Sequence, residues 1–155
     1  GIMKKIILII LGISLAVCQS AVLHKVLLKD PGALCLDGSP GAYYIARGTV
    51  PERVILYFEG GGWCGSGDLA STTESCYQRS KGALGSSNSY PETIAFSEGI
   101  LSNNVKNNFR EATKVFLKYC DGAGHQGFKT SPVSYKDAKL YFRGHNITQA
   151  QLADI

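Results

Sequence analysis

Residues 58–64, with the sequence Phe-Glu-Gly-Gly-Gly-Trp-Cys, form the segment of this chain whose residue types and spacing could carry chemistry. Glycines leave room for backbone N–H groups to converge on one point that side chains would otherwise block. A pair of such donors can stabilise the negative oxygen of a tetrahedral acyl-transfer intermediate. Taken alone, a glycine triplet is more typical of a plain turn, so the segment is a candidate oxyanion-binding loop.

Two other kinds of site fit this sequence less well. A phosphate-binding loop needs a Gly-Lys-Ser/Thr ending or the spaced glycines of a dinucleotide site, and Trp63-Cys64 stands where that lysine would be required. A zinc site is disfavoured because there is no Cys-x-x-Cys pair and no Cys/His cluster at zinc-ligand spacing. We therefore expect no metal and no cofactor.

Strands must position this loop. The continuous apolar run at residues 54–58 stops at the glycines, which predicts a central strand covered on both faces. Residues 81–108 are rich in Gly, Ser and Asn and predict a long irregular excursion. Further strands are predicted at residues 22–28, 43–45, 114–119 and 139–142.

Helices are predicted between some of these strands. One extends to about Arg79, with Ser71 or Thr72 as its cap, and another begins after Gly144, with Thr148 as its cap. The alternation of strand, glycine-rich loop and helix indicates an α/β fold.

The first twenty residues predict the compartment. Lys4 and Lys5 form a basic start, the apolar run from Ile6 to Val17 follows, and small and polar residues come next. This is the layout of a secretory signal peptide over residues 1–20, and the run is shorter than the about 20 apolar residues of a membrane span. We expect a secreted protein without stable membrane association after cleavage, and a single membrane anchor is the alternative.

The net charge and the number of cysteines further restrict which kinds of protein this chain can be. The formal net charge is +4, and it is +2 without Lys4 and Lys5. This charge is too small for nucleic-acid binding, and the sequence has no basic cluster with interleaved aromatic residues. Cleavage at or after Cys18 leaves four cysteines, an even number that favours two disulfides in an oxidising compartment. Spacing alone leaves three pairings open.

The glycine loop and six further short motifs, in a fixed order, resemble the pectin acetylesterase/Notum family, and they cover most of residues 34–153. The Gly-Gly-Gly-Trp-Cys loop is central, and its three glycines fit the pectin acetylesterases better than Notum, in which an aromatic replaces the third. The other motifs are Cys35-Leu36-Asp37-Gly38-Ser39-Pro40, Cys76-Tyr77-Gln78-Arg79, Leu84-Gly85-Ser86-Ser87, Gly99-Ile100-Leu101-Ser102, Tyr119-Cys120-Asp121-Gly122-Ala123 and Leu140-Tyr141-Phe142-Arg143-Gly144. Tyr57 and residues 124–127 depart from the family pattern, and the second departure puts substrate preference in doubt.

The resemblance implies a three-layer α/β-hydrolase, of which residues 21–155 would be an N-terminal and incomplete part. It implies an oxyanion site at Gly61, Gly62 and Trp63, and the disulfides Cys35–Cys120 and Cys64–Cys76. The nucleophile elbow Gly-x-Ser-x-Gly is absent from the sequence, so we expect no catalytic triad residue within this chain.

The remaining candidates have structural interpretations. His24, His125 and His145 do not match the family's catalytic histidine, and Asp121 is interpreted as a turn-capping residue. Asn146-Ile147-Thr148 is an N-glycosylation sequon.

The resemblance also implies a function for the complete protein: extracellular serine hydrolysis of acetyl esters on a polysaccharide such as pectin. The alternatives are a Notum-like carboxylesterase that removes an acyl group from a secreted protein, and a non-catalytic secreted binding module. The sequence does not indicate an oligomeric state.

Overall fold

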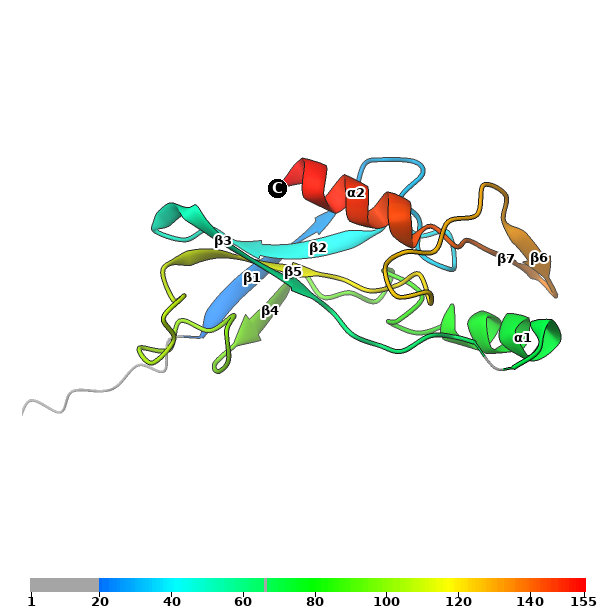
Figure 1. Cartoon of the computed structure of the whole chain (residues 1–155), viewed down its shortest axis with the longest axis horizontal. Coiled ribbons are helices and arrows are strands. Elements are labelled where there is room, and N and C mark those ends of the chain that lie inside the picture. Colours follow the sequence, from blue (N-terminus) through cyan, green and yellow to red (C-terminus); the bar gives the residue numbers. More distant parts are fainter. Residues whose placement is uncertain (1–19, 66) are drawn as a thin grey trace, which may run out of the picture.

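The computed structural model describes residues 20–65 and 67–155, which form a mixed five-stranded sheet, a small hairpin and two helices (Figure 1). The predicted signal peptide, residues 1–20, lies outside the described residues except for Ser20. The strands of the sheet are β1 Ala21–Leu27, β2 Ala42–Ala46, β3 Val50–Phe58, β4 Thr93–Phe96 and β5 Ala112–Leu117; the hairpin is β6 Val133–Tyr135 with β7 Ala138–Leu140; the helices are α1 Leu69–Arg79 and α2 Gly144–Asp154. Neither helix of this described part has the length and apolar character that a membrane span requires.

The sheet combines antiparallel and parallel pairs in the order β3-β5-β2-β1-β4. β1 pairs antiparallel with both β2 and β4, and β2 pairs antiparallel with β5. β3 and β5 are parallel neighbours. The carboxyl ends of these two strands therefore lie at the same end of the sheet, and the glycine loop begins at the carboxyl end of β3.

Two consecutive tyrosines of β2, Tyr43 and Tyr44, lie on opposite faces of the sheet. Tyr43 packs in a buried cluster with Val115 and Leu117 of β5 and Ile147 of α2. Tyr44 belongs to a cluster with Leu23 of β1 and Tyr90. Successive side chains of a strand point to opposite faces, so the two clusters are the cores on either side of the sheet.

Helix α2 is fixed to β2 by polar contacts as well as by Ile147. The side-chain amide of Gln151 donates to the Ala42 carbonyl at 2.8 Å, and the Tyr43 hydroxyl donates to a carboxylate oxygen of Asp154 at 2.9 Å. Burial, with this carboxylate as the second cause, raises the pKa of Tyr43 to about 12. The Tyr43 hydroxyl therefore remains a donor at neutral pH, and its hydrogen bond to Asp154 continues to hold α2 against the sheet.

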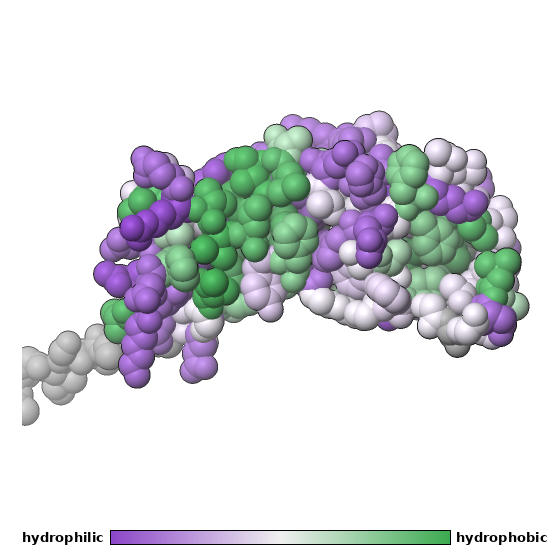
Figure 2. All heavy atoms as spheres, viewed as in Figure 1, coloured by the Kyte–Doolittle hydropathy of each residue, from purple (hydrophilic) through white to green (hydrophobic). Residues whose placement is uncertain are grey.

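The prediction that residues 54–58 are a central strand covered on both faces is wrong for the described part of the chain. β3 is the last strand of the sheet, and Val54, Leu56, Tyr57 and Phe58 are each 40–46% exposed. Figure 2 shows the hydrophobic surface that results over this part of the sheet. The apolar run has the composition of a two-sided buried strand, but no segment of residues 20–65 and 67–155 covers it.

The predicted helix caps are also wrong. Asp68, and not Ser71 or Thr72, caps α1, because its carboxylate accepts from the Ser71 backbone N–H at 2.9 Å. Arg143 occupies the N-cap position of α2 without a side-chain capping bond. Thr148 lies inside that helix and donates instead to the His125 carbonyl at 2.9 Å.

The other strand predictions hold with shifted bounds. Residues 22–28, 43–45 and 114–119 correspond to β1, β2 and β5. Residues 139–142 overlap β7, which pairs with β6 in a hairpin separate from the main sheet. The irregular excursion at 81–108 contains one short strand, β4, because Ile94 and Phe96 pack against the Tyr44 core.

Candidate active site

The glycine loop is anchored at its start by Glu59. The Glu59 backbone N–H donates to the Leu117 carbonyl of β5 at 3.0 Å. Its carboxylate accepts from the Lys118 ammonium at 2.5 Å and from the Tyr119 backbone N–H at 2.9 Å. The His125 imidazole Nε2 lies 2.8 Å from the Glu59 carbonyl oxygen. Glu59 thus joins the carboxyl ends of the two parallel strands and fixes where the loop leaves the sheet.

Side chains bind the carbonyl groups of Gly61, Gly62 and Trp63. One guanidinium nitrogen of Arg79, Nη1, donates to the carbonyls of Gly61 at 2.8 Å and Gly62 at 2.6 Å, and Nη2 donates to that of Trp63 at 3.3 Å. The Tyr119 hydroxyl also donates to the Gly62 carbonyl, at 2.9 Å. Burial raises the pKa of Tyr119, so its hydroxyl keeps the proton that this bond needs. The carbonyl side of the loop is therefore occupied.

The N–H groups of Gly60 to Trp63 have no acceptor among the described residues. Within residues 20–65 and 67–155, no acceptor bonds the backbone N–H of Gly60, Gly61, Gly62 or Trp63, whereas the Cys64 N–H donates to the Gly122 carbonyl at 3.0 Å. A run of unpaired donors with anchored carbonyls is the arrangement that can bind a negatively charged oxygen.

Gly61 and Gly62 are required for different reasons. A Cβ on Gly61 would lie 2.5 and 2.7 Å from carbons of the Tyr119 ring, so only glycine allows the close packing. Gly62 has a φ of +64°, the left-handed region that favours glycine, and a Cβ there would meet no atom within 4 Å. A substitution at Gly61 thus disturbs packing, and one at Gly62 disturbs backbone conformation.

Open space lies on both sides of the loop. Trp63 is 71% exposed beside a cavity of about 310 Å³ that Gln126 and Phe142 also line. A second cavity of about 310 Å³ adjoins Gly60 and is lined by Phe116 of β5. Residues 60–63 are themselves exposed, so this part of the loop is open to solvent.

Among the described residues, no histidine forms the pair that a nucleophilic serine needs. His24 and His145 are exposed. The His125 ring packs against Phe58 at 5.3 Å and Tyr119 at 4.9 Å between centroids, while its Nε2 bonds Glu59. In the part of the chain that the structure describes, no hydrogen bond joins a histidine ring to a serine hydroxyl.

Asp121 is the turn-capping residue that the sequence predicted. Its side chain is buried, and its two carboxylate oxygens accept from the backbone N–H groups of His125 at 3.1 Å and Gly127 at 3.3 Å. A Cβ on Gly144 would lie 2.0 Å from this carboxylate, so that glycine lets α2 begin against the turn. Asp121 thus shapes the segment that supports the loop.

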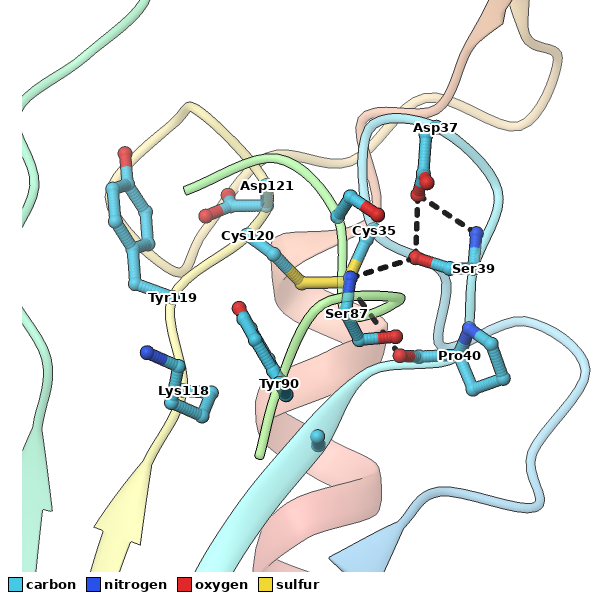
Figure 3. The surroundings of a disulfide bond; sticks show 12 residues. Cys35, Asp37, Ser39, Pro40, Ser87, Tyr90, Lys118, Tyr119, Cys120 and Asp121 are labelled. Atoms are coloured by element: carbon cyan, nitrogen blue, oxygen red, sulfur yellow. Dashed lines mark hydrogen bonds between the residues drawn. A yellow bond between two sulfur atoms is a disulfide. The ribbon is translucent and has the colours of Figure 1, made fainter. Parts of the chain in front are cut away.

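The structure contains the disulfides Cys35–Cys120 and Cys64–Cys76, which is the pairing that the family resemblance implied. Figure 3 shows Cys35–Cys120 between the turn at residues 35–40 and the segment that carries Tyr119 and Asp121. Cys64–Cys76 connects the end of the glycine loop to α1. The described residues hold no group of three or more His, Cys, Asp or Glu side chains that could bind a metal.

Sequence reasoning missed three residues that build the loop. Glu59 offered a weak signal, because a carboxylate directly after an apolar strand must find a partner. Arg79 was seen as part of a motif, but nothing in its local sequence indicated contact with residues 16–18 positions earlier. Tyr119 offered no signal, because its hydroxyl contact depends on the parallel pairing of β3 and β5.

Glycosylation of Asn146 remains a prediction. Asn146 lies in the first turn of α2, its Oδ1 is buried without a partner among the described residues, and its Nδ2 lies 3.2 Å from the position of a Cβ on Gly32. Nδ2 therefore lies close to the Gly32 backbone, which leaves little room for a glycan, and we expect that only a fraction of the molecules carries one. Glycosidase treatment of protein secreted from a eukaryotic host should then lower the mass of that fraction and leave an Asn146→Gln variant unchanged. No shift in correctly folded wild-type protein would contradict this expectation.

Comparison with known proteins places the loop in context. The family model described as Pectinacetylesterase matches residues 16–155. Pectin acetylesterase 5 of Arabidopsis thaliana is 36% identical over 132 residues, which are 82% of this chain and 29% of that protein. The zebrafish protein named inactive palmitoleoyl-protein carboxylesterase notum1b is 33% identical over 115 residues, 65% of this chain and 79% of that protein.

The fold comparison agrees with the sequence comparison. The structure of the Wnt deacylase Notum from Drosophila matches with a TM-score of 0.73 and 26% identity, over 86% of this chain and 38% of that one. The chain thus spans less than a third of the Arabidopsis relative and less than half of the Drosophila one.

Proposed function

The chain belongs to the pectin acetylesterase family, and from that premise we propose that the complete protein is a secreted serine esterase that removes acetyl groups from a polysaccharide such as pectin. The observation that carries the proposal is the row of free N–H groups between Gly60 and Trp63, whose neighbouring carbonyls are held by Arg79 and Tyr119. In such an esterase a serine attacks the acetyl carbonyl, and a histidine held by an aspartate takes its proton. Residues 21–155 would be the N-terminal part of the hydrolase domain and would supply the oxyanion site.

The glycine loop would act when the carbonyl oxygen of the substrate becomes negative. The free donors of Gly61, Gly62 and Trp63 would bind this oxygen more strongly in the tetrahedral state than in the ester, which is the requirement for acceleration. The open space beside Trp63 is compatible with a substrate on a polymer, because that indole is not enclosed. Two disulfides support the extracellular location, because such bonds persist in oxidising compartments.

A non-catalytic binding module is the second candidate, and the zebrafish relative favours it. That protein is named inactive, and the present chain covers 79% of its length. A Notum-like carboxylesterase acting on a longer acyl group is a third candidate, since the Drosophila structure is a Wnt deacylase.

One experiment separates these candidates. The complete protein, secreted from a eukaryotic host, would be incubated with acetylated pectin and, separately, with nitrophenyl esters of acetate and of a long-chain fatty acid. We expect acetate release from pectin and preference for the acetyl ester. Preference for the long-chain ester would favour the carboxylesterase, and binding to pectin without hydrolysis of any ester would favour the binding module.

Residues 21–155 alone should release no acetate. The printed sequence contains no Gly-x-Ser-x-Gly elbow, and an oxyanion site without an activated nucleophile gives little turnover. The same polypeptide should aggregate, because β3 has an edge that no described strand pairs with and apolar side chains that are 40–46% exposed. A Leu56→Lys change should raise the soluble yield, whereas Leu23→Lys, at a buried position, should lower it. Inhibitor-sensitive acetate release by the purified fragment would contradict this prediction.

A further inference from the structure

We propose that Arg79 is a positioning residue for the oxyanion site: its guanidinium holds the carbonyls of the loop so that the N–H groups of Gly62 and Trp63 face the reacting oxygen. This inference rests on the proposed function and assigns to a residue of α1 the orientation of that site. Arg79 touches neither the nucleophile nor the substrate in this scheme, and it acts through the loop backbone.

The argument begins with the geometry of the peptide group. In a trans peptide the carbonyl of one residue and the N–H of the next point in opposite directions. Arg79 binds the carbonyls of Gly61 and Gly62 at 2.8 and 2.6 Å. The N–H groups of Gly62 and Trp63 must therefore point away from the guanidinium, and both are unpaired within the described residues.

The third bond sets the end of this row of donors. Arg79 Nη2 lies 3.3 Å from the Trp63 carbonyl, and the N–H of the following residue, Cys64, donates to Gly122. The free donors thus stop at Trp63. A planar guanidinium has several donors in a fixed fork and can bind neighbouring carbonyls at once, which an ammonium group does less well.

The charge of Arg79 strengthens the effect. Within residues 20–65 and 67–155, no Asp or Glu carboxylate forms an ion pair with Arg79, so its hydrogen bonds go to loop carbonyls. A guanidinium stays charged at all working pH values. The cation therefore neutralises carbonyl dipoles whose negative ends would otherwise oppose the charge that develops on the substrate oxygen.

Helix α1 gives Arg79 a fixed platform. Arg79 is the last residue of the helix, and Cys76, one turn earlier, is bonded to Cys64 at the end of the loop. The hydroxyl of Tyr77 donates to Asp137 at 2.7 Å, and Glu74 accepts from Lys136 at 2.6 Å, so the helix is also held to the β6–β7 hairpin. The guanidinium thus reaches the loop from an element tied down on two sides.

The test uses the complete protein with Arg79→Lys and Arg79→Met. Lys136→Gln is the matched control, because it removes a contact of α1 with the hairpin and leaves the loop untouched. Active sites are counted by titration with a serine-reactive phosphonate, so that kcat is expressed per folded site. We expect kcat to fall by about 10²-fold in Arg79→Met and less in Arg79→Lys, with KM within a factor of two, and the control to match wild type. A merely structural role would instead lower the number of titrated sites and leave kcat per site unchanged, which would overturn the proposal.

A second readout keeps the proposal testable whatever the activity. The protein is labelled with fluorotryptophan, and the fluorine resonance of Trp63 is assigned by its loss in Trp63→Phe. We expect this resonance to shift in both Arg79 variants and not in Lys136→Gln. An unshifted resonance would overturn the positioning role. Wild-type protein without esterase activity would instead refute the proposed function, and the fluorine result would still decide whether Arg79 sets the loop.

Discussion

The complete protein with Gly62→Val should be secreted at near wild-type yield, and its kcat should be lower than that of the wild type by a factor of about 10²–10³. A Cβ at this position meets no atom within 4 Å, so the core is not disturbed. The backbone, however, has a φ of +64°, and a β-branched residue is a strained occupant of that region. We expect the peptide to rotate to relieve the strain, which turns the N–H groups of Gly62 and Trp63 away from the substrate oxygen.

The kinetic signature of Gly62→Val distinguishes catalysis from binding. The lost interaction exists mainly in the transition state, so kcat and kcat/KM should fall by the same factor. Measuring both with acetylated pectin, beside secreted yield, checks the prediction. Wild-type kcat in well-secreted Gly62→Val protein would remove Gly62 from the proposed oxyanion site.

Gly61→Ala is the informative contrast. Its Cβ would lie 2.5 Å from a carbon of the buried Tyr119 ring, so the two groups must separate. We expect lower yield together with lower activity, because the substitution disturbs packing under the loop. A single kind of residue at consecutive positions thus supports two functions, close packing at Gly61 and a left-handed turn at Gly62.

The comparison of sequence with structure shows why some elements were predictable. Short apolar and aromatic stretches located β1, β2 and β5, because these strands bury one or both faces against segments of the described chain. The apolar run at β3 correctly predicted a strand but wrongly predicted that both of its faces are covered. An apolar sequence indicates that its side chains favour burial, but it does not indicate which segment buries them. Asp68 replaced Ser71 as the cap of α1 because both can cap, and the backbone conformation that decides between them is not visible in the sequence.

The candidate site was predictable only in part. The glycines and Trp63 stand next to each other, so their pattern could be recognised, whereas the contacts that orient them come from distant positions. Arg79 reaches the loop because a disulfide joins Cys64 to Cys76, and Tyr119 reaches it because β5 lies parallel to β3. Such contacts arise from tertiary structure, and a single sequence does not encode them locally.

Cys35→Ala/Cys120→Ala should cost the complete protein about 4–5 kcal/mol of stability, since the bond closes a loop with a sequence separation of 85 residues. Cys64→Ala/Cys76→Ala, with a separation of 12, should cost about 3 kcal/mol. Net stabilities are about 5–15 kcal/mol, so the first loss can abolish secretion and the second need not.

The surroundings of Cys35–Cys120 add to this difference. Both cysteines are 0–1% exposed and pack with Val115 and Ile147 in the core under α2. The turn next to Cys35 is held by Ser39, whose hydroxyl bonds Asp37 and accepts from the Ser87 backbone N–H at 2.9 Å (Figure 3). Loss of the bond therefore loosens the strand ends, α2 and this turn together.

The two disulfides should also differ in what they do to catalysis. Cys64 ends the glycine loop, so protein without Cys64–Cys76 should be secreted but have a lower kcat per titrated site. Protein without Cys35–Cys120 should show low yield, and the molecules that fold should keep near wild-type kcat, because Glu59, Arg79 and Tyr119 still hold the loop. Urea unfolding midpoints, secreted yield and titrated kcat measure the three quantities. A larger stability loss from the 12-residue loop than from the 85-residue loop would show that native packing around Cys64, rather than chain entropy, controls the ranking.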